Sequence, residues 1–210
     1  MNTLLINSKK TKEISKILKN DGIIAFPTDT VFGLGCVYDS ELAINKIKKA
    51  KNRDENKPLP FMCADKETIY KIAKVNAKAA KIIDKLMPGA LTIVLEKKNS
   101  IPDYITNGFK TIAIRIPNDE LVLNILKELG KPMLVTSANI SDFPSCHNYL
   151  EVVKQLDGRI DAIIRGDSQD NLASTIVLAT NEDDIKIIRQ GIITIDDINE
   201  VLKGEWIWEI

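Results

Sequence analysis

The sequence predicts an α/β fold: a single domain, residues 1–210, built on a twisted mixed β-sheet flanked by helices. Short apolar runs typical of buried strands alternate along the chain with stretches in which apolar residues recur at helical spacing. A length of 210 residues suffices for one core, and no repeat, low-complexity tract or Gly/Ser linker divides it. Apolar residues at 44% and charged residues at 28% are typical of a globular protein.

The elements of the first half follow from periodicity and turn residues. Residues 11–20 repeat isoleucine and leucine on one helical face, and GIIAF at 22–26 has the pattern of a buried strand. Ser40 is a suitable N-cap for a helix that reaches Ala50. Beyond it we expect a strand at 58–63, one or two helices within 66–86, and a strand at 90–96.

The second half continues the alternation. Strands at 111–116 and 133–136 enclose a helix at Leu121–Leu129. A helix near 148–156 is then followed by strands at 161–164, 174–179 and 185–189. Because helices separate most of the strands, we expect a mixed sheet with helices packed against it.

Composition narrows the class of protein further. No apolar run reaches the roughly 18 residues that a membrane-spanning helix needs, and the first ten residues are too weakly apolar for a signal peptide, so we expect a cytoplasmic protein without a membrane partner. Cys36, Cys63 and Cys146 form no CxxC pair, and His147 is the only histidine, so no protein metal ligands are predicted. Cys146 and His147 are sequence neighbours whose side chains should point apart, which disfavours a catalytic dyad.

The segment PTDTVFGLG at 27–35 places small polar residues directly after a buried strand. Thr28, Asp29 and Thr30 could form the floor of a small-molecule pocket, while Gly33 and Gly35 permit close backbone approach or positive φ. The alternative is a turn in which the threonines bond only to their own backbone.

A cluster of cations follows at the end of the second helix. Lys51, Arg53 and Lys57 converge on the crevice side of the predicted sheet, although a solvated helix face would have the same composition. Because Lys plus Arg equals Asp plus Glu over the chain, attraction of an anion must come from such local clusters.

Two further segments suit anion binding. The run TSANISDFPS offers Ser137, Asn139 and Ser145 together with backbone amides, which can bind phosphate oxygens or simply form a turn. Arg115 stands within an otherwise apolar strand and needs an anionic partner unless it faces water. The chain has no GxxxxGK[ST] or GxGxxG motif, so a nucleotide would be held by groups at scattered strand ends.

Seven motifs in order extend over almost the whole chain: PTDTVFGLG at 27–35, KxRxxxxPL at 51–59, MPGALTIVL at 87–95, IAIRIP at 112–117, TSANIS at 136–141, ASTIV at 173–177 and IIRQG at 187–191. Together they resemble the YrdC/TsaC family, the threonylcarbamoyl-AMP synthases that begin the synthesis of threonylcarbamoyladenosine in tRNA. The resemblance implies a YrdC-like fold in the short form, without the extra C-terminal domain of longer members.

The resemblance also implies the substrates and their contacts. L-threonine, bicarbonate and ATP with Mg²⁺ would give threonylcarbamoyl-AMP and pyrophosphate, the magnesium being held by phosphates and water, and the product would pass to other tRNA-modification enzymes. No catalytic side chain is identified. The implied ATP-binding residues are Lys51, Arg53, Lys57, Thr111, Ser137, Asn139, Ser145 and Arg189, and the implied threonine-binding residues are Thr30, Arg115, Ser174 and Thr175.

The sequence departs from the family pattern at two positions, and three alternatives stay open. Met62 stands where some members have histidine, and Asp142 replaces a glycine in the loop after SAN. A double-stranded RNA-binding module is the main alternative, although zero net charge and 5% aromatic residues give it no independent support. The YrdC-like segment of hydrogenase-maturation carbamoyltransferases and a degenerate binding protein are two others.

Overall fold

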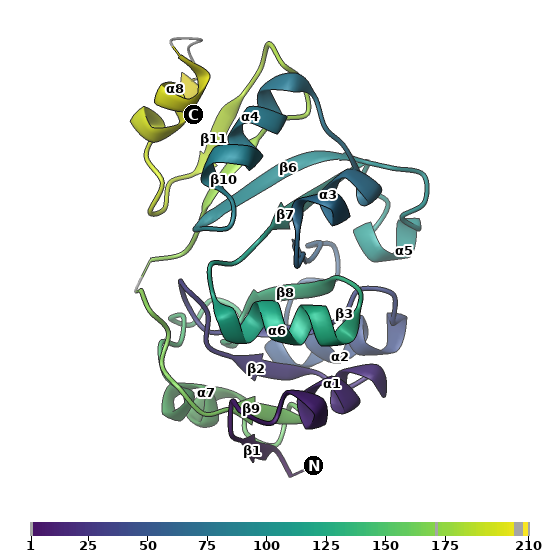
Figure 1. The fold of residues 1–210 in the computed structure, drawn as a ribbon. Coiled ribbons are helices and arrows are strands. Elements are labelled where there is room, and N and C mark those ends of the chain that lie inside the picture. The colour runs from purple at the N-terminus through teal and green to yellow at the C-terminus, as the bar shows by residue number, and fades with distance from the viewer. Residues whose placement is uncertain (1, 171, 204–207, 210) are drawn as a thin grey trace.

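In a computed structural model that describes residues 2–170 and 172–203, together with the backbone of 208–209, the chain forms one mixed β-sheet with helices on both faces (Figure 1). The strands are β1 (Leu4–Ile6), β2 (Ile24–Phe26), β3 (Gly33–Val37), β4 (Phe61–Met62), β5 (Ala73–Lys74), β6 (Leu91–Lys97), β7 (Thr111–Arg115), β8 (Met133–Ser137), β9 (Ala162–Ile164), β10 (Thr175–Leu178), β11 (Lys186–Arg189) and β12 (Trp208–Glu209). The helices are α1 (Thr11–Lys19), α2 (Glu41–Lys51), α3 (Lys66–Ile72), α4 (Ala77–Leu86), α5 (Asp103–Thr106), α6 (Glu120–Leu129), α7 (Tyr149–Leu156) and α8 (Ile195–Leu202). The predicted α/β fold is confirmed.

Strands distant in sequence are neighbours in the sheet. The order is β1-β9-β2-β3-β8-β4-β7-β6-β10-β11-β12, with β5 beside β6. The sheet contains both parallel pairs, such as β4 with β7 and β6 with β10, and antiparallel pairs, such as β3 with β8 and β6 with β7. Side-chain contacts then join the segment after β2 to β7, because Arg115 of β7 donates to Asp29 and Thr30.

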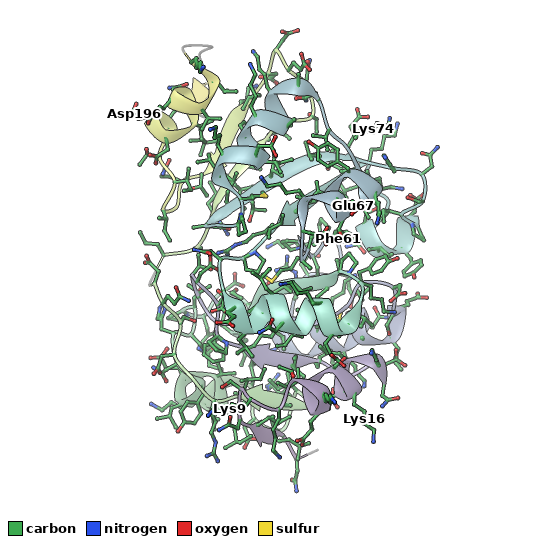
Figure 2. All side chains as sticks on the ribbon, in the orientation of Figure 1. Lys9, Lys16, Phe61, Glu67, Lys74 and Asp196 are labelled. Atoms are coloured by element: carbon green, nitrogen blue, oxygen red, sulfur yellow. The ribbon has the colours of Figure 1, made fainter. Side chains whose placement is uncertain are left out.

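Helices cover the two faces of the sheet unequally. One face carries the larger core, in which buried residues of α2, α4, α7 and α8 pack on the strands. On the other face α1 and α6 lie side by side over β2, β3, β8 and β9 (Figure 1) and enclose a smaller core. Figure 2 shows Phe61, which is 1% exposed, near the centre of the molecule, and the charged residues Lys16, Lys74 and Asp196 at its periphery.

The helix that leads to the cationic segment begins and ends as its sequence predicts. The Ser40 side chain accepts a hydrogen bond from the Ala43 amide, which caps the first turn of α2. Asn52 ends the helix with a left-handed backbone at φ 52°, a conformation that asparagine tolerates. This turn directs the chain from Lys51 into the loop that carries Arg53 and Lys57.

Several expected elements are confirmed and others differ. Helices are present where 11–20, 121–129 and 148–156 predict them, and 66–86 divides into α3 and α4. The strand expected at 58–63 is limited to Phe61–Met62, because Pro58 and Pro60 lack the amide hydrogen that a ladder needs. In the described part of the chain, no helix is long and apolar enough to cross a membrane.

Candidate functional site

The segment after β2 is both a locally bonded turn and part of a pocket. The Thr28 hydroxyl accepts from the Thr30 amide at 3.0 Å and lies 2.7 Å from the Val31 carbonyl, to which it donates. The Thr30 hydroxyl in turn accepts a hydrogen bond of 2.7 Å from Arg115. The local turn therefore positions the Thr30 hydroxyl beside the arginine.

Gly33 and Gly35 serve close packing. A Cβ atom at Gly33 would lie 3.0 Å from Val135 and 3.1 Å from the ring of Phe26, and one at Gly35 would meet the same two side chains. Neither glycine has positive φ. Of the two reasons that the sequence offered for these glycines, the structure supports close approach.

Arg115 is a buried cation with a buried counter-ion. Its guanidinium donates to Asp29 at 2.8 Å, to the Thr30 hydroxyl at 2.7 Å and to the Gly89 carbonyl at 3.0 Å. The arginine side chain is 8% exposed and the aspartate side chain 7%, so the anionic partner that burial requires is present. Burial lowers the pKa of Arg115, and Asp29 opposes that shift. Two of its five N–H groups remain for a ligand.

A cavity of about 430 Å³, here called the arginine cavity, is lined by residues of several strands, among them β6, β7, β8 and β10. Among the described residues that line it, three are arginines, Arg53, Arg115 and Arg189, and none is acidic. Its walls also include hydroxyl groups and apolar side chains, namely Thr28, Thr30, Met62, Thr92, Val94, Ala113, Val135, Ser137, Ser145, Ser174 and Ile176. Cationic, hydroxyl and apolar surfaces together suit a small zwitterion joined to a larger anion.

Ser174 and Arg189 face each other across β10 and β11. Arg189 donates to the Ser174 carbonyl at 2.7 Å and to its hydroxyl at 3.2 Å, and that hydroxyl lies 2.7 Å from the hydroxyl of Thr92. Burial lowers the pKa of Arg189, and the positive charge of Arg115 lowers it further. An anion bound between these two arginines would relieve their repulsion.

Strand alternation places Thr175 outside this cavity. Ser174 and Ile176 line it, whereas Thr175, between them, faces the larger core. The Thr175 hydroxyl donates to the Ile193 carbonyl at 2.6 Å and accepts from the Gly191 amide at 3.0 Å. The Thr175 hydroxyl is thus directed to the loop after β11 and not into this cavity, and a contact between Thr175 and threonine stays a prediction.

Thr111 also lies outside both cavities described here. It shares the face of β7 that Ala113 and Arg115 present to the arginine cavity, but it stands at the far end of that strand, opposite Glu96. A contact between Thr111 and the nucleotide stays a prediction.

A second cavity of about 410 Å³, here called the phosphate cavity, adjoins the first. One wall is the segment that carries Lys51, Arg53 and Lys57, and the other is the segment that carries Ser137 and Asn139. Arg53 and Ser137 line both cavities, so the two spaces meet at these residues. All five of these predicted residues are thus brought together.

Lys51 is fully buried at the base of the phosphate cavity. Its ammonium donates to the Ser137 carbonyl. It also donates to the Asn139 carbonyl, at 2.5 Å, and lies 3.5 Å from the Asn139 side-chain oxygen. Burial lowers the pKa of Lys51 to about 7, and the nearby charge of Arg53 contributes. The Asn139 amide donates to the Ile140 and Phe143 carbonyls, both at 2.8 Å. Both side chains thus hold the 137–143 loop in shape.

The two departures from the family pattern both lie at the site. Asp142 has a left-handed backbone at φ 68°, a conformation that glycine adopts freely and aspartate tolerates, and its side chain lines the phosphate cavity. Met62 is 5% exposed and lines the arginine cavity beside Arg115, its register partner on β7. The loop therefore keeps its turn with an added negative charge, and the arginine cavity gains an apolar wall.

The described residues around these cavities present neither a metal-binding cluster nor an ionised thiol. In the described residues, no group of three or more histidine, cysteine, aspartate or glutamate side chains could hold a metal ion. Burial raises the pKa of the Cys146 thiol to about 11, and Gln155 donates to its sulfur at 3.4 Å.

Sequence reasoning missed several residues of the site. Asp29 was predicted as part of a pocket floor, but its pairing with Arg115, which spans 86 positions, was not foreseen. Thr92 lies in an apolar run that reads as strand interior, and Val135 lies in another. Strand alternation could have assigned them to a face, but only the sheet order shows that this face is open.

The fold and the two adjoining cavities define an α/β protein with a cationic cleft suited to a polyphosphate next to a small amino acid. The comparisons give the family. The protein-family model named for Sua5, YciO and YrdC, which is described as telomere recombination, matches residues 16–191 of this chain. The chain belongs to this Sua5/YciO/YrdC family, as its motifs predict.

Named relatives agree with this assignment. A Methanocaldococcus jannaschii protein, provisionally named a threonylcarbamoyl-AMP synthase, is 37% identical over 92% of this chain and 93% of its own. The threonylcarbamoyl-AMP synthase of Bacillus subtilis is 33% identical over 95% of this chain and 58% of its own. The structure of Pyrococcus abyssi Sua5 complexed with L-threonine superposes on this one with a TM-score of 0.90, and the two sequences are 30% identical. The match covers 99% of this chain and 62% of the Sua5 chain. The chain thus spans about three fifths of the last two proteins.

Proposed function

We propose that this protein is a threonylcarbamoyl-AMP synthase, a nucleotidyltransferase that converts L-threonine, bicarbonate or CO₂, and ATP into threonylcarbamoyl-AMP and pyrophosphate for the modification of tRNA. The observation that carries the proposal is the junction of the two cavities at Arg53 and Ser137. A triphosphate in the phosphate cavity would present its α-phosphorus to a ligand in the arginine cavity. The names of the relatives and the L-threonine complex of Sua5 support the choice of substrates.

The arginine cavity suits threonine. A carboxylate can accept the two remaining N–H groups of Arg115, which Asp29 and Thr30 hold in a fixed orientation. Hydroxyl groups of Thr92 and Ser174 lie nearby for polar contacts, while Met62 and Val135 offer apolar surface for a methyl group. Thr30, Arg115 and Ser174 are the residues we assign to threonine.

The phosphate cavity suits the tail of ATP. The half-buried Arg53 and the exposed Lys57 offer cationic groups, and the buried Lys51 lies below them. Ser137, Ser145 and Arg189 line the arginine cavity, and we assign them to the part of ATP that extends into it. Magnesium carried by the phosphates would complete the neutralisation of a tail that bears about four negative charges.

The reaction needs little from a protein nucleophile. The neutral amine of threonine adds to CO₂ and loses a proton to give a carbamate. A carbamate oxygen then attacks the α-phosphorus of ATP as the bond to the β-phosphate oxygen breaks and pyrophosphate leaves. Positioning and charge neutralisation supply most of the catalysis in such steps. Because one continuous sheet carries both cavities, we propose that residues 1–210 act as a single domain. A role in tRNA modification would place the protein in the cytoplasm.

Pyrophosphate release tests the proposal directly. The protein is incubated with ATP, Mg²⁺, bicarbonate and single amino acids, and release is expected to require both threonine and bicarbonate. Release that ignores either one would contradict the proposal. Salt-sensitive binding of double-stranded RNA that survives saturating ATP and threonine, without any pyrophosphate release, would favour the RNA-binding alternative.

A further inference from the structure

We infer that Lys48 and Asn107 form a positioning pair that fixes the loop carrying Arg53 and Lys57, and thereby sets the shape of the phosphate cavity. The inference rests on the proposed function only for the identity of the ligand, ATP. Neither residue lines the arginine cavity or the phosphate cavity, so neither is expected to touch substrate.

Lys48 is a buried lysine whose charge is used inside the protein. It lies on α2 one turn before Lys51 and is 7% exposed. Its ammonium donates to the Glu55 carbonyl at 2.9 Å and to the Asn107 side-chain oxygen at 3.1 Å, and it lies 3.6 Å from the Glu55 carboxylate. A buried ammonium persists only where such acceptors surround it, so these contacts fix Glu55 to the helix.

Asn107 holds the same carbonyl from the other side. Its side-chain amide donates to the Glu55 carbonyl at 2.8 Å, so that one oxygen accepts from both members of the pair. Asn107 ends α5 with a left-handed backbone at φ 52°, which fixes where its side chain projects. The clamp therefore joins α2 and α5 at the middle of the 52–57 loop.

The loop transmits this constraint to its cations. The Arg53 amide donates to the Lys48 carbonyl at 2.9 Å, and the Lys57 amide donates to the Asp54 carbonyl at 3.2 Å, so the loop is closed on both sides of Glu55. The Arg53 guanidinium also donates to the Pro58 carbonyl at 3.1 Å. A displacement of Glu55 would move both cations.

Two buried lysines on one helix thus hold the two walls of the phosphate cavity. The Lys51 ammonium holds the wall at 137–139 by donating to the carbonyls of that segment. The Lys48 ammonium holds the wall at 52–57 by donating to the Glu55 carbonyl. Because both walls are already ordered in the free protein, less conformational freedom is lost when the ligand binds, and binding is stronger.

The test replaces Lys48 by methionine, which keeps an unbranched stem and removes the ammonium. Lys49→Met is the matched control, because Lys49 is the adjacent residue of α2 and is exposed. Asn107→Gly removes the side-chain amide while glycine keeps the left-handed backbone. The measurements are the KM values for ATP and for threonine, and calorimetric binding of inorganic tripolyphosphate by the same full-length variants.

We expect Lys48→Met to raise the KM for ATP by about tenfold and to weaken tripolyphosphate binding to a similar degree, with the KM for threonine within about twofold of the original. Asn107→Gly should shift the same two quantities in the same direction by about threefold, and Lys49→Met should change neither. Hydrogen exchange at the Arg53 and Lys57 amides should accelerate in Lys48→Met, while the Ser141 amide, which donates to the Lys51 carbonyl at 2.8 Å, should keep its rate.

The inference would be overturned if Asn107→Gly bound tripolyphosphate as tightly as the unchanged protein and Lys48→Met did so too. It would also be overturned if Asn107→Gly kept that affinity and Lys48→Met failed to fold. Equal effects on the KM values for ATP and threonine would overturn it as well. If the unchanged protein released no pyrophosphate, the proposed function would fail, and the tripolyphosphate comparison would still decide whether the clamp shapes an anion site.

Discussion

Replacing Asp29 by asparagine should lower the free energy of unfolding by about 3 kcal/mol, because it leaves the buried Arg115 without its counter-ion. The nitrogen-to-oxygen distance of this pair is 2.8 Å, and both side chains are at least nine-tenths buried. Asp29 also accepts from the Asn118 amide at 3.0 Å, and a side-chain amide cannot replace both acceptor oxygens. Breaking a buried pair typically costs about 3 to 5 kcal/mol, and the neutral amide keeps part of the contact.

The chain offers a matched control at the same distance. Lys131 and Asp39 also lie 2.8 Å apart, but their side chains are 36% and 40% exposed, so Asp39→Asn should cost at most about 1 kcal/mol. Urea unfolding followed by circular dichroism measures both variants, with an unchanged dependence on urea concentration as the check that the midpoints are comparable. A cost for Asp29→Asn no greater than that for Asp39→Asn would refute the reasoning that Arg115 depends on this partner.

Three further predictions concern titration and charge at and around the site. Since burial lowers the pKa of Lys51 to about 7, ATP binding at pH 8 should take up to about one proton from solution, because the phosphates favour the ammonium form. The observed binding enthalpy should then vary with the ionisation enthalpy of the buffer, and a buffer-independent enthalpy would contradict this. Asp142→Asn and Asp142→Gly both keep a residue that tolerates the left-handed backbone, and both remove a negative charge from the phosphate cavity. Each should therefore lower the KM for ATP by about twofold to fivefold. An unchanged KM in both variants would mean that the carboxylate does not act on the phosphates. Burial raises the pKa of the Cys36 and Cys63 thiols, so neither should react with a disulfide reagent at pH 8 until urea is added, and rapid reaction of either in the folded protein would count against their burial.

Local patterns were sufficient for many elements of this fold. The N-cap at Ser40 and the apolar spacing of α6 depend on neighbours along the chain, and both helices were predicted close to their observed bounds. β3 was missed because its glycines read as turn chemistry. Their real reason is the ring of Phe26 on the next strand, which only the pairing of β2 with β3 reveals.

The site shows the same division between local and distant information. The cationic segment at Lys51 and the hydroxyl-rich segment at Ser137 could each be identified, and β3 and β8 bring them to one cavity. Thr175 was assigned to the threonine pocket, although alternation allows only one of Ser174 and Thr175 to face it. Choosing between them requires knowing which face of β10 is covered, and that depends on its pairing with β6. The roles of Lys48 and Asn107 likewise depend on a contact between α2 and α5 that no motif encodes.

The most direct test of the account is a structure of this protein with L-threonine and a non-hydrolysable ATP analogue. The threonine carboxylate should lie on Arg115, the terminal phosphates between the loop of Lys57 and the loop of Ser137, and the α-phosphate where the two cavities meet at Arg53. Amino acid and triphosphate bound in separate places, or a triphosphate outside the cavity formed by these loops, would contradict the claim that one continuous cleft performs the reaction.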